Sequence, residues 1–163
     1  MIIRIFITGG TIDDLEYDSL DKAPKSHKSL IPDLLEKIRI KTSYEIEELM
    51  LKDSKFITDE DRELILKRCI QCNEEKIIIT HGTMTMEKTA KYLGKENIKK
   101  TIVLTGSTIP ANKKDTDALV NINKAFSEVQ KLSNGVYISM NKKIFPWNNV
   151  KKNLETCNFE KEK

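Results

Sequence analysis

Apolar and polar positions along the chain predict strands and helices in turn. Short β-branched runs indicate buried strands, whereas apolar side chains three or four positions apart indicate helices. We expect strands at Ile2–Ile7, Glu45–Leu51, Lys76–Thr80, Thr101–Thr105 and Gly135–Met140. Strands that alternate with helices through short turns are typical of a parallel sheet between helical layers. The pattern therefore predicts an α/β fold in a single domain, a doubly wound, mostly parallel sheet with helices on both faces.

Helices are expected in the segments between these strands. One spans Ile31–Arg39, with Pro32 tolerated in its first turn. The next follows a capping box of Thr58 and Asp61, and a third covers about ten residues from Thr85. The fourth runs from Asp115 to Leu132. The apolar stripe of the second is expected at Leu64, Ile65, Cys69 and Ile70, and that of the fourth at Ala118, Ile122, Ala125, Phe126 and Val129. Residues 8–29 show no clear period, which predicts a long loop or exposed hairpin of the kind that often serves as a lid.

Length and charge narrow the class of protein. The chain has 163 residues, enough for about one domain. It carries 28 Lys and Arg against 25 Asp and Glu, a net charge of +3. This balance argues against a dedicated nucleic-acid binder, whose basic residues should cluster. The apolar run at the start is too short for a membrane span or a secretory core. We expect a cytoplasmic protein with neither nucleic-acid nor membrane partners.

Three cysteines, Cys69, Cys72 and Cys157, are expected to be reduced thiols. Cys69 and Cys72 form a C-x-x-C, which in a cytosolic protein can indicate redox chemistry or half of a metal site. It falls near the end of a helix, however, where the dipole raises a thiol pKa. No second ligand pair accompanies it, because His27, His81 and Cys157 lie at no metal-binding spacing. Packing on a helix face is the favoured interpretation, so no metal and no cofactor is expected.

Candidate chemistry gathers where the strands end. Ligands of doubly wound sheets bind outside the carboxyl ends of the strands. Glycine, hydroxyl or charge follows four of the five expected strands, as Thr8-Gly9-Gly10-Thr11-Ile12, Lys52-Asp53-Ser54, His81-Gly82-Thr83-Met84-Thr85-Met86 and Gly106-Ser107-Thr108. Each alone could be a turn or a helix cap. Together at one edge they favour a ligand site, although the glycine motifs of nucleotide-binding proteins are absent.

At these residues the sequence resembles the bacterial-type L-asparaginases. TGGTI and HGTMTMEKTA are similar to the signatures that read TGGTIA and HGTDTMEETA in that family. The likeness continues through residues 103–110, 117–121 and 150–152. With Phe145-Pro146-Trp147 and Asn153, the chain resembles more narrowly the compact asparaginase-like proteins built from the N-terminal domain alone. We accordingly expect an asparaginase N-terminal-like domain over residues 1–157 and a charged C-terminal tail over 158–163.

The resemblance implies hydrolysis of a small amide, asparagine or a related compound, through an acyl-enzyme. Thr11 matches the nucleophilic threonine, and Tyr17 matches a tyrosine that helps to activate it. Thr83 matches the second-segment threonine and Lys152 the lysine paired with it. A desolvated lysine lowers the cost of deprotonating a nearby hydroxyl, and N–H groups of the turns can hold the oxyanion. Expected at the substrate are Gly10, Lys52, Asp53, Ser54, Gly82, Met84 and Ser107.

The sequence departs from the family pattern at three points. Met84 replaces an aspartate that contacts the substrate amino group, and a thioether cannot supply that charge. Leu51 and Lys52 stand near a Ser-Gln pair that binds the substrate carboxylate in larger members. The chain also lacks the second domain of full asparaginases, so we expect homo-oligomerisation. Two hypotheses follow: an amidohydrolase with altered substrate preference, or a catalytically impaired protein that binds a small molecule.

Overall fold

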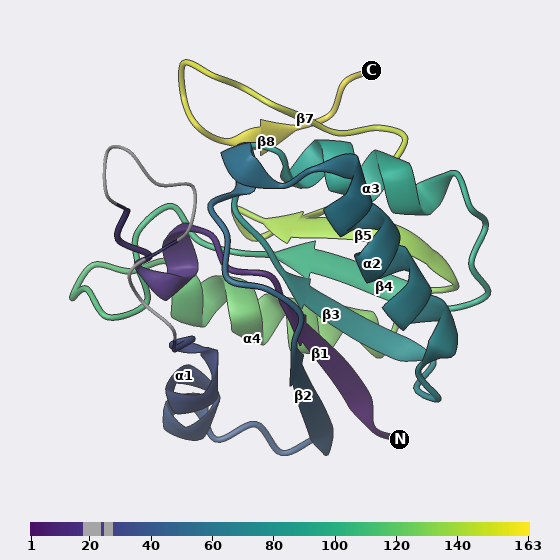
Figure 1. Cartoon of the computed structure of the whole chain (residues 1–163), viewed down its shortest axis with the longest axis horizontal. Coiled ribbons are helices and arrows are strands. Elements are labelled where there is room, and N and C mark those ends of the chain that lie inside the picture. Colours follow the sequence, from purple (N-terminus) through teal and green to yellow (C-terminus); the bar gives the residue numbers. More distant parts are fainter. Residues whose placement is uncertain (18–23, 25–27) are drawn as a thin grey trace.

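The computed structural model describes residues 1–17, 24 and 28–163. Its centre is a six-stranded sheet in the order β2-β1-β3-β4-β5-β6 (Figure 1). The first five of these strands run parallel, and β6 pairs with β5 antiparallel. The strands are β1 (Ile3–Ile7), β2 (Tyr44–Glu48), β3 (Lys76–Thr80), β4 (Thr101–Thr105), β5 (Gly135–Met140) and β6 (Lys143–Pro146). The strand order reverses direction between β1 and β3, which is where ligands of such sheets bind.

Helices cover both faces of the sheet, as the apolar pattern predicts. On one face lie α1 (Ile31–Ile38) and α4 (Ala118–Val129), and on the other α2 (Asp59–Gln71) and α3 (Met86–Gly94) (Figure 1). Alternation along β1 sends Ile3, Ile5 and Ile7 into the α1–α4 core and Phe6 into the α2–α3 core. The fold is thus a doubly wound α/β domain, and the expected face of α4 is buried throughout.

The end of β2 and the buried face of α2 differ from the expectation. β2 ends at Glu48 instead of Leu51, because its partner β1 ends at Ile7 and the chain then turns into Gly9 and Gly10. The stripe of α2 was expected to include Leu64 and Ile70, but they are 41% and 57% exposed. The buried face consists instead of Arg62, Ile65, Leu66 and Cys69. The expected Thr58–Asp61 capping box is present.

Short elements complete the chain. η1 (Thr11–Asp13) follows β1, and η2 (Ser54–Phe56) precedes α2. A small antiparallel pair, β7 (Lys151–Lys152) and β8 (Phe159–Glu160), lies beside α3 (Figure 1). Of the expected charged tail, Phe159 is buried and forms β8 with Glu160. Within the long loop expected over residues 8–29, residues 18–23 and 25–27, with His27 among them, lie outside the described residues.

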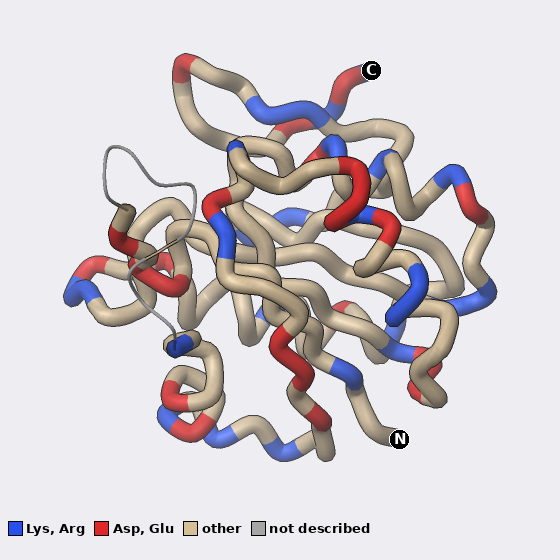
Figure 2. Tube along the Cα trace, in the orientation of Figure 1, with Lys and Arg blue, Asp and Glu red and all other residues tan. Residues whose placement is uncertain are grey.

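Along the described part of the trace, Lys and Arg are interspersed with Asp and Glu (Figure 2). Among the described residues, no helix is long and apolar enough to cross a membrane. The three cysteines are free; Cys69 and Cys72 are buried, and Cys157 is exposed. Burial raises the pKa of the Cys69 thiol, which opposes the thiolate that redox and metal chemistry require.

Candidate functional site

The loops that follow β1, β2, β3 and β4 meet at the carboxyl edge of the sheet. Each close approach requires a glycine. A Cβ on Gly9 would lie 2.5 Å from the backbone nitrogen of Lys52, and a Cβ on Gly10 would lie 2.4 Å from the Cα of Gly82. A Cβ on Gly106 would lie 2.3 Å from the His81 carbonyl oxygen. The four strand ends therefore form one continuous backbone surface, with the β1 and β3 loops in direct contact.

Gly10 and Gly82 are the two glycines on which this surface depends most. Gly10 has a φ of 94°, in the region that favours glycine, and directly precedes Thr11. Gly82 directly precedes Thr83 and packs so closely on Ser54 that a Cβ would lie 2.7 Å from the Ser54 Cβ. The contact of the two glycines brings the segments that carry Thr11 and Thr83 together.

Thr83 and Lys152 form a direct contact between residues far apart in the sequence. The Lys152 Nζ donates a hydrogen bond of 2.9 Å to the Thr83 Oγ1. Lys152 is half-buried on β7, and its backbone N–H donates to the Glu87 carboxylate on α3. Because Thr83 Oγ1 accepts a hydrogen bond from Lys152, its own hydroxyl proton points away from Lys152 and can be donated to another acceptor. The pair thus combines a hydroxyl that can donate with a cation that can stabilise negative charge on it.

Thr11 begins η1 and is exposed at the edge of the sheet. Within the described part of the chain, its hydroxyl makes no hydrogen bond. The Tyr17 hydroxyl accepts the backbone N–H of Asp53, while its ring packs against Phe56 with centroids 5.2 Å apart. Burial raises the pKa of the Tyr17 phenol. Tyr17 therefore lies at the β2 loop, with its phenol proton available to another acceptor.

The three residues after β2 are engaged with the protein itself. Lys52 Nζ forms an ion pair of 2.8 Å with Asp61 of the α2 capping box. The Asp53 side chain accepts the Lys55 N–H and caps η2. Ser54 is buried, and its Oγ accepts the Thr85 N–H at 3.2 Å. These contacts tie the β2 loop to the β3 loop, so Lys52 meets a ligand only in competition with Asp61.

Met84 and Ser107, which complete the predicted set, lie in opposite environments. Met84 is 60% exposed and Ser107 is buried. The Ser107 Oγ donates to the Ile109 carbonyl at 2.6 Å, which shapes the turn after β4. Asp117 accepts the N–H groups of Thr108 and Ile109 in the same turn. Met84 thus leaves a solvent-facing apolar side chain beside Thr83.

Two buried polar residues near the site were not predicted. Asp13 is buried in η1, and its Oδ1 accepts from the Ser29 Oγ at 2.6 Å and from the Leu30 N–H at 2.8 Å. Burial raises the pKa of this carboxyl. Arg62 is buried beneath the site although it is charged. The signal for Arg62 was available: it lies three and four positions before Ile65 and Leu66, in step with the buried face of α2.

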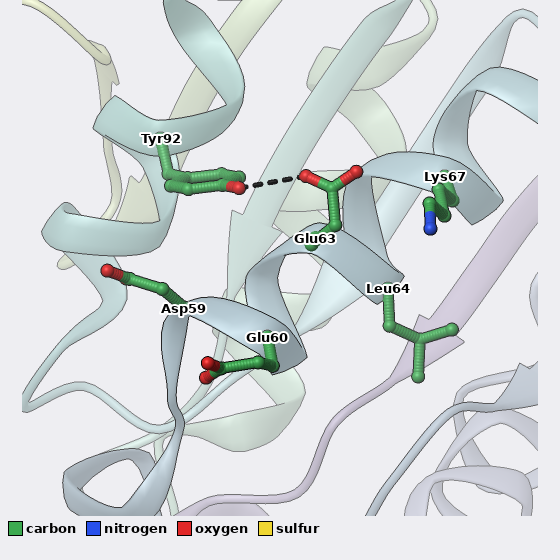
Figure 3. Close-up of a pocket in the computed structure, with 6 residues that line it drawn as sticks. All are labelled: Asp59, Glu60, Glu63, Leu64, Lys67 and Tyr92. Atoms are coloured by element: carbon green, nitrogen blue, oxygen red, sulfur yellow. Dashed lines mark hydrogen bonds between the residues drawn. The ribbon is translucent and has the colours of Figure 1, made fainter.

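A separate hollow on the outer surface lies between α2 and α3 (Figure 3). Tyr92 donates to the Glu63 carboxylate at 2.9 Å across it, and Asp59, Glu60, Leu64 and Lys67 complete the lining. None of the predicted site residues lines it. Within the residues that the structure describes, no three His, Cys, Asp or Glu side chains are grouped as metal ligands would be.

Comparison with known proteins gives consistent results for sequence and structure. The family described as "Asparaginase, N-terminal" matches residues 2–159. The "Probable L-asparaginase periplasmic" of Haemophilus influenzae is 32% identical over 165 aligned positions, 95% of this chain and 47% of the relative. The thermostable L-asparaginase from Thermococcus kodakarensis superposes with a TM-score of 0.80 at 27% identity, covering 99% of this chain and 51% of that one. A probable cytoplasmic L-asparaginase from Campylobacter jejuni gives 0.81 at 28% identity, covering 98% and 52%. The chain spans about half the length of the relatives it matches.

Proposed function

Because the chain belongs to the asparaginase family, we propose that it hydrolyses the side-chain amide of asparagine or a related small compound, with Thr11 as the nucleophile. The observation that carries this proposal is the 2.9 Å contact between Lys152 Nζ and Thr83 Oγ1. It pairs a hydroxyl with a cation across 69 residues, at the edge where the β1 and β3 loops touch. Such a pair has no evident use in packing, because neither residue is fully buried.

The proposed reaction uses each of these groups once. The Thr11 hydroxyl adds to the amide carbonyl carbon as its proton passes to solvent water, and the backbone N–H groups of the β1 and β3 turns hold the oxyanion that forms. Thr83 passes its proton to the departing nitrogen and regains one from the Lys152 ammonium, and solvent then returns a proton to Lys152. Ammonia leaves, and an ester between the substrate acyl group and Thr11 remains. Water then hydrolyses the ester and restores Thr11.

The remaining predicted residues have supporting roles in this proposal. Tyr17 assists Thr11, since its phenol accepts the Asp53 N–H and keeps its own proton for donation. Gly10 and Gly82 permit the close approach of the two turns. Asp53, Ser54 and Ser107 shape the walls through their own hydrogen bonds. Lys52 would bind a substrate carboxylate by releasing Asp61.

Ammonia release tests this proposal directly. Purified protein is incubated with a panel of small amides, and the native chain is compared with Thr11→Ala and Thr83→Ala. Thr42→Ala, a threonine beyond the opposite end of β2, serves as the matched control. We expect release by the native chain and by the control, with a loss of at least a hundredfold, on the order seen for catalytic groups, in the two site variants. No release from any amide would overturn the proposal.

Met84 favours a second candidate function, a catalytically impaired protein that binds a small molecule at the same edge. Its exposed thioether stands where the family signature has a carboxylate. A substrate ammonium group would therefore lack an anionic partner at this position. A small molecule that co-purifies with the chain and is not turned over would favour this alternative.

Association between copies of the chain and a cytoplasmic location also belong to the proposal. Apolar side chains are exposed around the carboxyl edge, at Met84, Leu119, Val120 and Leu154. A second copy that covered them would remove them from water. Light scattering after size exclusion would contradict association if it gave a monomer throughout. Fractionation of cells that produce the full natural protein would test the location.

A further inference from the structure

A line of buried hydrogen bonds joins the start of α2 to the turn that carries Thr83. Arg62 Nη1 donates to Asp59 Oδ1 at 3.0 Å, and Arg62 Nε donates to Thr89 Oγ1, also at 3.0 Å. Thr89 Oγ1 lies 2.8 Å from His81 Nε2, and His81 Nδ1 lies 2.7 Å from the Gly82 carbonyl oxygen. Arg62, Thr89 and His81 are each at most 1% exposed. We name these three side chains, with Asp59, the α2–β3 relay.

The partners restrict where the protons of the α2–β3 relay lie. A carbonyl oxygen can only accept, so His81 carries a proton on Nδ1 and donates it to Gly82. Thr89 accepts from the guanidinium, which has no lone pair to offer, and its own hydroxyl proton can be donated to His81 Nε2. This arrangement fits a neutral imidazole. Burial and the nearby Arg62 charge lower its pKa to about 4, which keeps it neutral near neutral pH.

Burying the charged Arg62 in the α2–β3 relay costs more free energy than an apolar side chain of the same size would. A charged side chain is placed on the buried face of α2, and its acidic partner Asp59 is itself 69% exposed. Replacing a buried ion pair with apolar residues is often neutral or stabilising. Stability alone therefore does not account for Arg62. Through Thr89, Arg62 orients His81, which donates a hydrogen bond to the Gly82 carbonyl oxygen.

We propose that the α2–β3 relay aims the Thr83 backbone N–H at the reacting amide. A trans peptide is planar, so a hydrogen bond that holds the Gly82 carbonyl on one side directs the Thr83 N–H to the other. Within the described part of the chain, that N–H donates to no protein acceptor. Gly82 has no side chain, so the hydrogen bond from His81 adds to the restraint that close packing against Gly10 and Ser54 provides. His81, Thr89 and Arg62 are positioning residues, and their catalytic effect rests on the proposed function.

Two substitutions at His81 separate positioning from packing. The amide nitrogen of Asn matches Nδ1 of His, whereas that of Gln matches Nε2. H81N keeps the donor to Gly82 and loses the contact with Thr89; H81Q does the reverse. Both lose the imidazole, so both are expected to be less stable. H81Q should lower kcat by about tenfold to a hundredfold with KM little changed, and H81N by a smaller factor, since a misaligned oxyanion donor acts in the transition state.

Nuclear magnetic resonance tests the α2–β3 relay independently of activity. The chain has two histidines, so the ring nitrogens of His81 can be assigned with an H27N control. We expect a neutral ring protonated on Nδ1 at about pH 7. The Thr83 amide signal should move most in H81Q, which loses the contact with Gly82, and less in H81N, which loses only the contact with Thr89. A ring protonated on Nε2, a charged ring, or equal movement in both variants would overturn the inference.

Substitutions at Thr89 cover the case in which a His81 variant fails to fold. Thr89→Ser keeps the hydroxyl, and Thr89→Val keeps the shape without it. Thr89→Val should shift the His81 ring signals and the Thr83 amide, and Thr89→Ser should restore both. Identical spectra for the two would contradict the inference. If the native chain releases no ammonia while these spectra are as expected, the proposed function fails and the positioning of Thr83 stands.

Discussion

Acid should destabilise this fold through His81. The ring is fully buried, and burial lowers its pKa from 6.5 to about 4. Between these values the unfolded chain binds a proton that the folded chain excludes, so stability falls as the pH falls. Each pH unit in that window costs about 1.4 kcal/mol. The free energy of unfolding should therefore drop by about 3 kcal/mol between about pH 7 and about pH 4 from this residue alone.

The assay is urea unfolding followed by the fluorescence of Trp147, the single tryptophan, across this pH range. Other acidic groups are also shifted: burial raises the pKa of Asp13, whereas Arg68 and Arg4 lower the pKa values of Glu47 and Glu74. The native chain and H81N share these groups, so the difference between the two curves isolates His81. That difference should shrink by about 3 kcal/mol on acidification. Parallel curves would refute the argument that His81 is held neutral.

Three further predictions concern the site. Gly10→Ala should lower the free energy of unfolding by about 2–5 kcal/mol, because its Cβ would overlap the Gly82 backbone at a positive φ. The control is Gly135→Ala, where the nearest atoms belong to the Tyr137 side chain and the cost should be smaller. Equal costs would contradict the close approach of Gly10 and Gly82. Lys152→Met should lower kcat for ammonia release by about a hundredfold. Lys151→Met, which removes an exposed ion pair with Glu160, should leave kcat unchanged. Equal losses in the two variants would count against the pair of Lys152 and Thr83. Met84→Asp should lower KM for asparagine about fivefold, which is the worth of a partly exposed charge pair. KM for the same amide without its amino group should not change. An equal change for both amides would show that residue 84 binds no ammonium group.

The sequence predicts the fold well where burial is symmetrical. β3 and β4 lie inside the sheet with helices on both faces, so their apolar runs match the observed bounds. β2 is an edge strand with polar residues, and its end is set by the length of β1, which no local pattern contains. Similarly, β7 and β8 are too short for a periodic signal.

In the candidate site, too, local sequence patterns predict some residues, and others depend on the path of the chain. Glycine and hydroxyl residues after buried strands indicate the carboxyl edge, because topology alone brings strand ends together. The family resemblance implies the pairing of Lys152 with Thr83, but no local pattern does, because the contact depends on the path of residues 141–152. Arg62 reaches the site through Thr89 and His81, and such a path through three elements leaves no spacing in the sequence.

Capture of the acyl-enzyme tests directly whether Thr11 is the nucleophile. The chain is mixed with asparagine, quenched in acid before hydrolysis is complete, digested and analysed by mass spectrometry. We expect one β-aspartyl group, attached through an ester to the peptide that contains Thr11, and none in Thr11→Ala. The same group attached to Thr83, or ammonia released by the native chain with no acylated peptide at any quench time, would contradict the assignment of Thr11 as the nucleophile.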